Sequence, residues 1–367
     1  MNRTELPRVL MITNEPHAGD EPGFRDALEQ LTVGHELAGW EALEPRAWHR
    51  RGLPWAECVT RMVEATQAFC PDILIVLSPG TCPWQDNDVT SVLRAAGGDV
   101  SLLYWEGDPW GGRKRVNESM DSWAVKADIL FTVAGGKQAR RLADGGARDV
   151  RLVLQTYCQI QYADALAWSD SRTDFVDPPM DVVSICNSAV RWPMVPAGVP
   201  GARQRRRMVT SLQAERRIRF GVYGHGWSGE TALGPVAYHS QVQALRQSLI
   251  TVNWDHFPSL PGYNSDRLPI SMLAGRVHVS TRHPQTPWLP GPESGLVLAE
   301  SPRAAHAAVV ELASKTSDEL LGLGQLAHQW VLGRLSDLES MRFMLASVTT
   351  TVGPPPPEPW AQIPSFS

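Results

Sequence analysis

The residues best suited to chemistry gather in the stretch 248–295. An apolar run at 249–252 gives way to a loop rich in Pro and Gly, then to Asn264, Ser265, Asp266 and Arg267, and a short apolar segment ends at Gly275. The N-terminus of a helix offers N–H groups and a positive dipole end, and an arginine can bind a phosphate through two parallel hydrogen bonds. The sequence therefore predicts an anion site at residues 264–267.

A glycine-rich loop upstream is a second candidate. The strand-like run 217–223 leads into Gly224, His225, Gly226 and Trp227, and Tyr238 follows. Glycine lets a backbone approach a diphosphate or a base closely. The loop has neither the G-x-G-x-x-G spacing nor a P-loop lysine, so neither phosphate-binding fingerprint applies.

The first half has its own candidates at the ends of predicted strands. Glu106 and Asp108 follow the apolar run 100–105, between Trp105 and Trp110, and His17 lies in the loop after the run 8–13. A carboxylate half-buried by aromatic rings has a raised pKa and can act as a general base. The alternative for Asp108 is structural, as the cap of a turn before Pro109.

Apolar runs that alternate with helical patterns predict the elements that position these residues. We expect strands at 8–13, 72–77, 100–105, 128–133 and 150–154, with a further candidate at 36–43, and in the second half at 181–186, 217–223, 249–252 and 277–279. Helical spacing separates them, which favours doubly wound parallel sheets. We predict an α/β protein with domains at 1–162 and 181–352, a linker at 163–180, and a Pro-rich tail at 353–367 that is extended or disordered.

Composition narrows the classes of function. The net charge of −5 argues against a nucleic-acid partner, and the basic run 203–207 is interpreted as a solvated helix face. The five cysteines have no zinc or disulfide spacing. The N-terminal apolar run is too short for a signal peptide, and no run is long enough to span a membrane, so we expect a cytoplasmic protein.

The 14 tryptophans are unusual, and half of them lie in predicted loops near Pro or Gly. Aromatic faces stack on sugars and other flat ligands, while the alternative is that they fill contacts between loops and domains. The residues concerned are Trp84, Trp105, Trp110, Trp192, Trp227, Trp254 and Trp288.

The order of these features resembles GT-B glycosyltransferases, with two Rossmann-like domains facing a cleft. Within them, the second half is similar to bacterial spore-maturation-type (CgeB-like) enzymes and their family 1-annotated relatives. The resemblance is carried by the strand 220–223, the loop 224–227, Tyr238, the strand 250–253, Ser265 to Arg267, the helix 268–275 and the strand 277–280. The motifs CPDILIVL, YWEGDPW and KADILFTVA carry a looser resemblance in the first half.

That resemblance implies a glycosyltransferase of hexosyl type. The donor, a UDP- or dTDP-sugar, would place its diphosphate on Arg267 and its base against residues 224–227 and Tyr238. The acceptor, a small molecule, peptide or glycan, would lie near His17, Glu106 and Asp108. Such enzymes need no cofactor and no divalent metal. A high content of Arg, Ala, Gly and Pro suggests a bacterial source and a role in natural-product biosynthesis.

The sequence departs from related retaining families at the positions where they bind the sugar. Related retaining families carry two glutamates eight positions apart, where this sequence has Gly262 and Ile270, and Glu293 could partly stand in. Retaining and inverting chemistry both stay open, as does the oligomeric state. Two other functions also stay open, because fold does not fix function. One is a nucleotide-sugar epimerase or hydrolase, and the other is a non-catalytic ligand-binding module.

Overall fold

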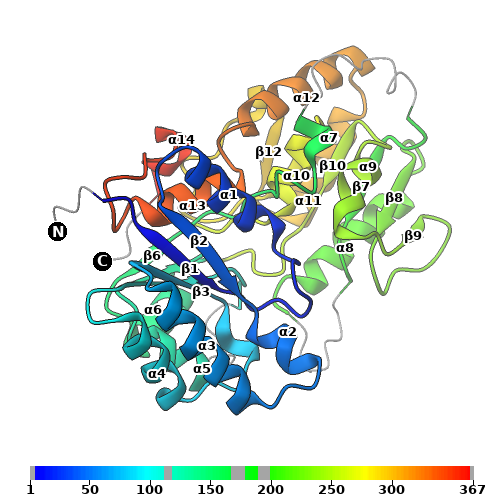
Figure 1. The fold of residues 1–367 in the computed structure, drawn as a ribbon. Coiled ribbons are helices and arrows are strands. Elements are labelled where there is room, and N and C mark those ends of the chain that lie inside the picture. Colours follow the sequence, from blue (N-terminus) through cyan, green and yellow to red (C-terminus); the bar gives the residue numbers. More distant parts are fainter. Residues whose placement is uncertain (1–4, 111–117, 167–177, 189–198, 364–367) are drawn as a thin grey trace. The chain divides into compact units, whose positions relative to one another are not determined.

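The protein is described by a computed structural model, which covers residues 5–110, 118–166, 178–188 and 199–363 (Figure 1). The chain divides into two compact units. Unit 1 consists of Met1–Leu154, Pro261–Tyr263 and Asp337–Ser367, and unit 2 of Gln155–Leu260 and Asn264–Ser336. Each unit is built on one six-stranded sheet.

The sheet of unit 1 is entirely parallel, in the order β2-β1-β3-β4-β5-β6. Its central strands are short continuous apolar runs because helices cover both faces. The strands are β1 (Arg8–Ile12), β2 (Gly39–Leu43), β3 (Ile73–Leu77), β4 (Ser101–Glu106), β5 (Ile129–Thr132) and β6 (Val150–Leu152). The helices are α1 (Pro22–Val33), α2 (Pro45–Arg50), α3 (Trp55–Phe69), α4 (Asp86–Ala96), α5 (Glu118–Ala124), α6 (Lys137–Asp144), α13 (Asp337–Leu345) and α14 (Pro357–Trp360), with a 3-10 turn, η1 (Pro79–Thr81).

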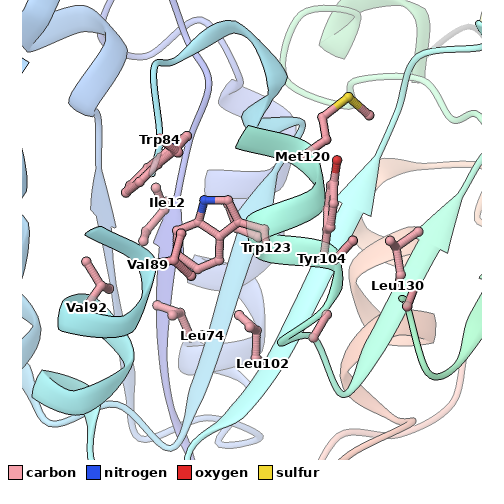
Figure 2. Close-up of a cluster of buried hydrophobic side chains, with 14 of the residues drawn as sticks. Ile12, Leu74, Trp84, Val89, Val92, Leu102, Tyr104, Met120, Trp123 and Leu130 are labelled. Carbon is pink, nitrogen blue, oxygen red and sulfur yellow. The ribbon is translucent and has the colours of Figure 1, made fainter. Parts of the chain in front are cut away.

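Aromatic side chains fill much of the core on one face of this sheet (Figure 2). The rings of Trp84 and Trp123 meet edge to face with centroids 4.9 Å apart, and Trp55 packs on Trp84 in the same way at 5.0 Å. Such pairs are worth about 0.5–1.5 kcal/mol beyond their buried area. The tryptophans therefore fix how α3, α4 and α5 lie on the sheet.

The sheet of unit 2 is also parallel, in the order β12-β11-β10-β7-β8-β9. Its strands are β7 (Val182–Ile185), β8 (Phe220–Tyr223), β9 (Ala232–Gly234), β10 (Ile250–Val252), β11 (Val277–Thr281) and β12 (Leu296–Ala299). The helices are α7 (Ala163–Leu166), α8 (Ala202–Ala214), α9 (Gln241–Leu245), α10 (Arg267–Leu273), α11 (Pro302–Leu312) and α12 (Ser317–Val331), with 3-10 turns η3 (Tyr238–Ser240) and η4 (Pro292–Ser294). The prediction of two doubly wound, Rossmann-like parallel sheets is confirmed.

Residues after 336 differ from the prediction. The second domain is expected to extend to residue 352, but α13 belongs to unit 1, where it packs on α1. Arg342 of α13 donates two hydrogen bonds to Glu36, at 2.8 and 2.7 Å. Local periodicity predicts a helix, but it does not show on which sheet the helix packs.

The Pro-rich tail is expected to be extended or disordered, but residues 353–363 are ordered and Pro357–Trp360 form the short helix α14. The N–H of Gly353 donates to Glu36 at 2.8 Å, and Trp360 is 3% exposed, with its ring 5.0 Å from that of Phe343. One buried indole and one backbone hydrogen bond hold the segment on unit 1. Of the predicted linker 163–180, residues 163–166 form α7 and 167–177 lie outside the described residues. No helix in the described ranges is long and apolar enough to cross a membrane.

Candidate functional site

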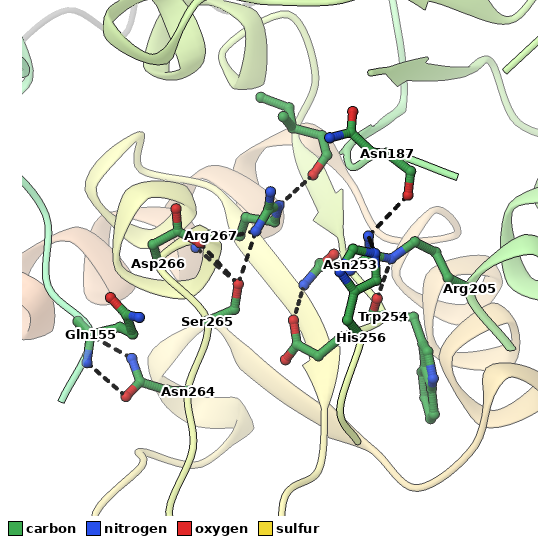
Figure 3. A network of polar contacts seen from close by, with 12 residues as sticks. Gln155, Asn187, Arg205, Asn253, Trp254, His256, Asn264, Ser265, Asp266 and Arg267 are labelled. Atoms are coloured by element: carbon green, nitrogen blue, oxygen red, sulfur yellow. Dashed lines mark hydrogen bonds and ion pairs between the residues drawn. The ribbon is translucent and has the colours of Figure 1, made fainter. Parts of the chain in front are cut away.

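In unit 2 the strand order reverses between β7 and β10, since β7, β8 and β9 run one way across the sheet and β10, β11 and β12 the other. Open α/β sheets bind ligands beyond the carboxyl ends of the strands at such a reversal. Here these ends lead into Asn187 after β7 and into Asn253, Trp254, Asp255 and His256 after β10 (Figure 3). This edge of the sheet is the candidate site.

Arg267, a residue of the predicted anion site, lies at this edge, and its role in binding an anion stays a prediction (Figure 3). Its Nε donates to the carbonyl of Ile185, the last residue of β7, at 2.9 Å. Its Nη1 donates to Asp266 at 3.0 Å and to the Ser265 hydroxyl at 3.3 Å. The side chain is 29% exposed, so these contacts fix it without sealing it from solvent. A cation held in this way can bind an anion without first being ordered.

The other residues of the predicted anion site have different roles. Asn264 is 2% exposed and makes two hydrogen bonds with the backbone of Gln155, at 3.2 and 3.0 Å, so it clamps two segments of unit 2 together. Asp266 pairs with Arg267, and the Ser265 hydroxyl also accepts from the N–H of Arg267 at 3.4 Å. Because α10 has only seven residues, the helix dipole that the sequence suggested contributes little here.

Arg205 is a residue of the site that sequence reasoning missed. The basic run 203–207 was interpreted as a solvated helix face, which is wrong for this residue because it is 1% exposed. Its Nε donates to the carbonyl of Trp254, and its Nη1 donates to the carbonyl of Asn187 at 3.0 Å and to the ring of His256. Arg205 therefore joins the segments that follow β7 and β10, the two strands that flank the reversal.

The charges around Arg205 and Arg267 follow from burial. Burial lowers the pKa of His256, and the two arginines lower it further, to about 3. For Asp255, burial alone would raise the pKa, but the hydrogen bond and charge of His283, with the two arginines, bring it to about 2. Asp255 accepts from His283 at 2.8 Å. At neutral pH the edge therefore carries a neutral His256 and an ionised Asp255.

The partners Asp255 and His283 follow two neighbouring parallel strands, β10 and β11. Their position just after two predicted strands is the sequence pattern that marks Asp255 and His283 as candidate site residues.

The glycine loop approaches protein backbone. Gly224 has φ +129°, and a Cβ on it would lie 2.2 Å from the carbonyl oxygen of Cys186. The N–H of His225 donates to the Asn187 side chain at 2.8 Å, and the indole of Trp227 to the Cys186 carbonyl at 2.6 Å. A Cβ on Gly226, at φ +82°, would lie 2.2 Å from the Ser188 hydroxyl oxygen. The glycines thus let the loop after β8 pack on the segment after β7, beside the candidate site.

Two further predicted residues lie elsewhere in unit 2. Tyr238 is 40% exposed in η3, and its carbonyl accepts from the Tyr162 hydroxyl at 2.8 Å. Glu293 is exposed in η4, immediately before β12. It therefore lies at the amino edge of the sheet, opposite Arg267, and the hypothesis that it stands in for a sugar-binding glutamate does not fit this placement.

The predicted catalytic residues lie in unit 1. His17 is exposed and its N–H donates to Asp20 at 3.0 Å. Glu106 is 3% exposed and accepts from the Tyr104 hydroxyl at 2.8 Å. Asp108 is exposed rather than half-buried by aromatic rings, so the environment predicted for a base is absent, and its role as a base stays a prediction.

The loop that carries Asp108 is held by Gln138, a residue that no pattern in the sequence marks as important. Gln138 is fully buried, and its amide donates to the carbonyl of Asp108 at 3.0 Å while accepting from the N–H of Trp110 at 2.9 Å. The position of the Asp108 backbone is therefore set from the N-terminal turn of α6.

The loop tryptophans are mainly packing residues. Trp84, Trp110, Trp254 and Trp288 are between 2% and 4% exposed, Trp105 and Trp227 are partly buried, and Trp192 lies outside the described residues. Trp84, Trp110 and Trp254 belong to the hydrophobic cores, so burial explains them without a ligand. Within the described ranges, no group of three or more His, Cys, Asp or Glu is arranged to hold a metal ion.

Residues 203–343, which include Arg205 and Arg267, match a family model described as glycosyl transferase-like. No curated protein matches the sequence. Solved structures with a similar fold include a glycosyltransferase from Rickettsia africae (TM-score 0.57, 10% identity, 94% of this chain and 98% of that chain covered). Another is HepE of Anabaena in complex with UDP and glucose (TM-score 0.56, 9% identity, 94% and 100% covered).

A third similar structure is a putative UDP-N-acetylglucosamine 2-epimerase from Listeria monocytogenes (TM-score 0.50, 13% identity, 95% and 99% covered). Identities this low show the fold alone. Together with the two six-stranded parallel sheets, they define the class of protein: it has the GT-B fold. The family model adds that much of unit 2, including the candidate site, is glycosyl transferase-like in sequence.

Proposed function

We propose that the protein is a glycosyltransferase that moves a sugar from a UDP- or dTDP-sugar to a small-molecule, peptide or glycan acceptor. The observation that carries the proposal is Arg267, whose side chain is anchored on the last residue of β7 and is 29% exposed at the strand reversal of a GT-B fold. A fixed cation at that point suits the diphosphate of a nucleotide sugar. The similar fold of HepE, which was solved with UDP and glucose, supports the same donor class.

The proposed reaction needs no cofactor and no divalent metal, since Arg267 would carry the charge compensation that a metal ion supplies elsewhere. The acceptor would be bound by unit 1, near His17, Glu106 and Asp108, with Asp108 as the base. The hexosyl specificity, the cytoplasmic location and the bacterial natural-product role belong to the same proposal. So does the closer relation to CgeB-like enzymes.

A donor screen tests the reaction type. Thermal shift with UDP-, dTDP- and other nucleotide sugars finds the donor, and nucleotide release is then followed with and without acceptors. Release that depends on an acceptor supports transfer. Epimerised or hydrolysed donor in the absence of acceptor supports a nucleotide-sugar epimerase or hydrolase. The absence of a thermal shift with any nucleotide argues against both enzymes and favours a binding module for another ligand.

The Arg267→Ala variant tests the placement of the donor. Removing one charged partner of a buried hydrogen-bonded pair typically costs about 2–5 kcal/mol of binding, which calorimetry with UDP measures. The matched control is Arg219→Ala, because Arg219 is also partly exposed and paired with a carboxylate, Asp181, but lies at the amino end of β8. We expect the control to bind UDP like the wild type. Equal affinities of the two variants would show that the diphosphate lies elsewhere.

The Asp108→Asn variant tests the proposed base. Donor binding should be retained while turnover falls by about 100-fold or more, the usual contribution of a general base. Asp99→Asn is the control, because Asp99 is exposed at the opposite end of β4. If Asp108→Asn turns over as fast as this control, Asp108 is not the base.

A further inference from the structure

Behind Arg267, unit 2 contains a small cavity that the proposed function does not use. Its lining includes Arg267, Asn253, His278, Thr251 and Ser271. The volume is about 10 Å³, which is room for one water-sized sphere. Two of the lining side chains carry buried polar atoms whose hydrogen-bonding capacity can be worked out from their neighbours.

Asn253 presents an acceptor. The side chain is 1% exposed, and its amide nitrogen donates to Oδ1 of Asp255. Because Asp255 is ionised and can only accept, the amide cannot be turned the other way. The oxygen of Asn253 therefore faces away from Asp255, and it has no donor among the described residues.

His278 presents a second acceptor. The Thr251 hydroxyl donates to the carbonyl of Val277 at 3.2 Å, so it accepts from Nδ1–H of His278 at 2.9 Å. Burial lowers the pKa of His278 to about 4, so the ring is neutral at pH 7 and Nε2 carries a lone pair. This atom is buried too, and no donor in the described part of the chain reaches it.

The two unpaired acceptors belong to residues that line one cavity, and each favours a donor nearby, since an unpaired buried acceptor costs about 1–3 kcal/mol in general. The Arg267 guanidinium on the same lining repels a cation, and the two lone pairs repel an anion. A neutral molecule with two protons satisfies every neighbour.

We propose that one ordered water occupies this cavity, donates to Asn253 Oδ1 and His278 Nε2, and turns its lone pairs toward Arg267. Asn253 and His278 then act through the water as positioning residues for the arginine. This second step rests on the proposed function, because it assumes that Arg267 binds the donor. The water itself does not depend on that assumption.

A crystal structure of the full chain without nucleotide, at a resolution that defines waters, tests the site. We expect density for one water within hydrogen-bond distance of both Asn253 Oδ1 and His278 Nε2. A cavity without such density, or a direct contact between the two side chains, overturns the proposal. Because no nucleotide is present, this result is independent of the proposed function.

Two variants test the positioning role. In His278→Gln the new side chain can place an acceptor near the position of Nε2, whereas in His278→Asn it reaches only the position of Nδ1. Circular dichroism first confirms that both fold, and calorimetry then measures UDP binding. We expect His278→Gln to stay within about 2-fold of the wild type and His278→Asn to bind about 5–10-fold more weakly, the loss of about one hydrogen bond.

If His278→Gln and His278→Asn bind UDP with equal affinity, the positioning role is overturned. A histidine that only supports the fold would give no reason for glutamine to be tolerated better than asparagine. If the wild type binds neither UDP nor dTDP, the proposed function fails, and the crystallographic water still decides whether the site exists.

Discussion

Replacing Arg205 with methionine tests how the edge of unit 2 is held together. Arg205 is 1% exposed and hydrogen-bonds the carbonyls of Trp254 and Asn187, which follow β10 and β7. Methionine keeps most of the buried stem but leaves both carbonyls without this donor. Leaving the buried Trp254 carbonyl unpaired costs about 1–3 kcal/mol, and the part-buried Asn187 carbonyl adds less, so the expected loss in free energy of unfolding is about 2 kcal/mol or more.

The matched control is Arg206→Met on the same helix. Arg206 is exposed, so its replacement should change stability by no more than about 0.5 kcal/mol. Both variants keep the same helix propensity and lose the same charge, so their difference isolates the buried contacts.

Native-state hydrogen exchange is the suitable assay because the chain has two units, and a single unfolding midpoint would mix them. In Arg205→Met, amides of β7 and β10 should exchange about 30-fold faster or more, which corresponds to about 2 kcal/mol. Amides of β1 and β3 in unit 1 should be unchanged. If β7 and β10 exchange at the same rate in the two variants, the contacts of Arg205 do not stabilise this edge.

Two other predictions concern stability. The pKa values of His256 and His278 are lowered to about 3 and 4, so near pH 6.5 these side chains take up protons only in the unfolded chain. The free energy of unfolding should therefore fall as pH drops below 6.5. At pH 5 the expected loss is about 2 kcal/mol for each histidine. Hydrogen exchange of the β10 and β11 amides at pH 7 and pH 5, corrected for the intrinsic pH dependence of exchange, measures this in unit 2, and a stability of unit 2 that rises toward pH 5 would contradict it. Trp360→Ala should destabilise unit 1 by about 3–5 kcal/mol, because the indole is 3% exposed. The control is Gln362→Ala, at an exposed neighbour, which should leave the stability of unit 1 unchanged. Equal melting temperatures for the two variants would show that the tail does not stabilise unit 1.

The sequence was sufficient for the fold because parallel strands buried on both faces leave a local signal. The runs 72–77 and 128–133 became β3 and β5 within one or two residues at each end. The reversal of strand order in unit 2 follows from no local pattern. It depends on which strand pairs with β7, and that pairing joins residues about 70 positions apart in the sequence.

The site was only partly predictable because residue type does not reveal the partner. Arg267 was found from its position after a predicted strand and loop. Asn264 looked equally suitable, but its partner is the backbone of Gln155, 109 residues away. Arg205 and Arg206 are adjacent and chemically identical, and only the packing of α8 makes one buried and the other exposed. Contacts of this range are tertiary, and a single sequence does not encode them in its local spacing.

Because the chain is synthesised from its N-terminus, the packing of α13 on unit 1 has a consequence for folding. During synthesis, residues 155–336 leave the ribosome before α13 and α14, so unit 2 is complete while unit 1 still lacks two of its helices. Until residues 337–363 emerge, the face of α1 that α13 covers is open, and Glu36 lacks Arg342 and Gly353. Domains usually fold in the order of their synthesis. This chain reverses that order, so its first unit is the last to be finished and the one more in need of protection from aggregation as it emerges.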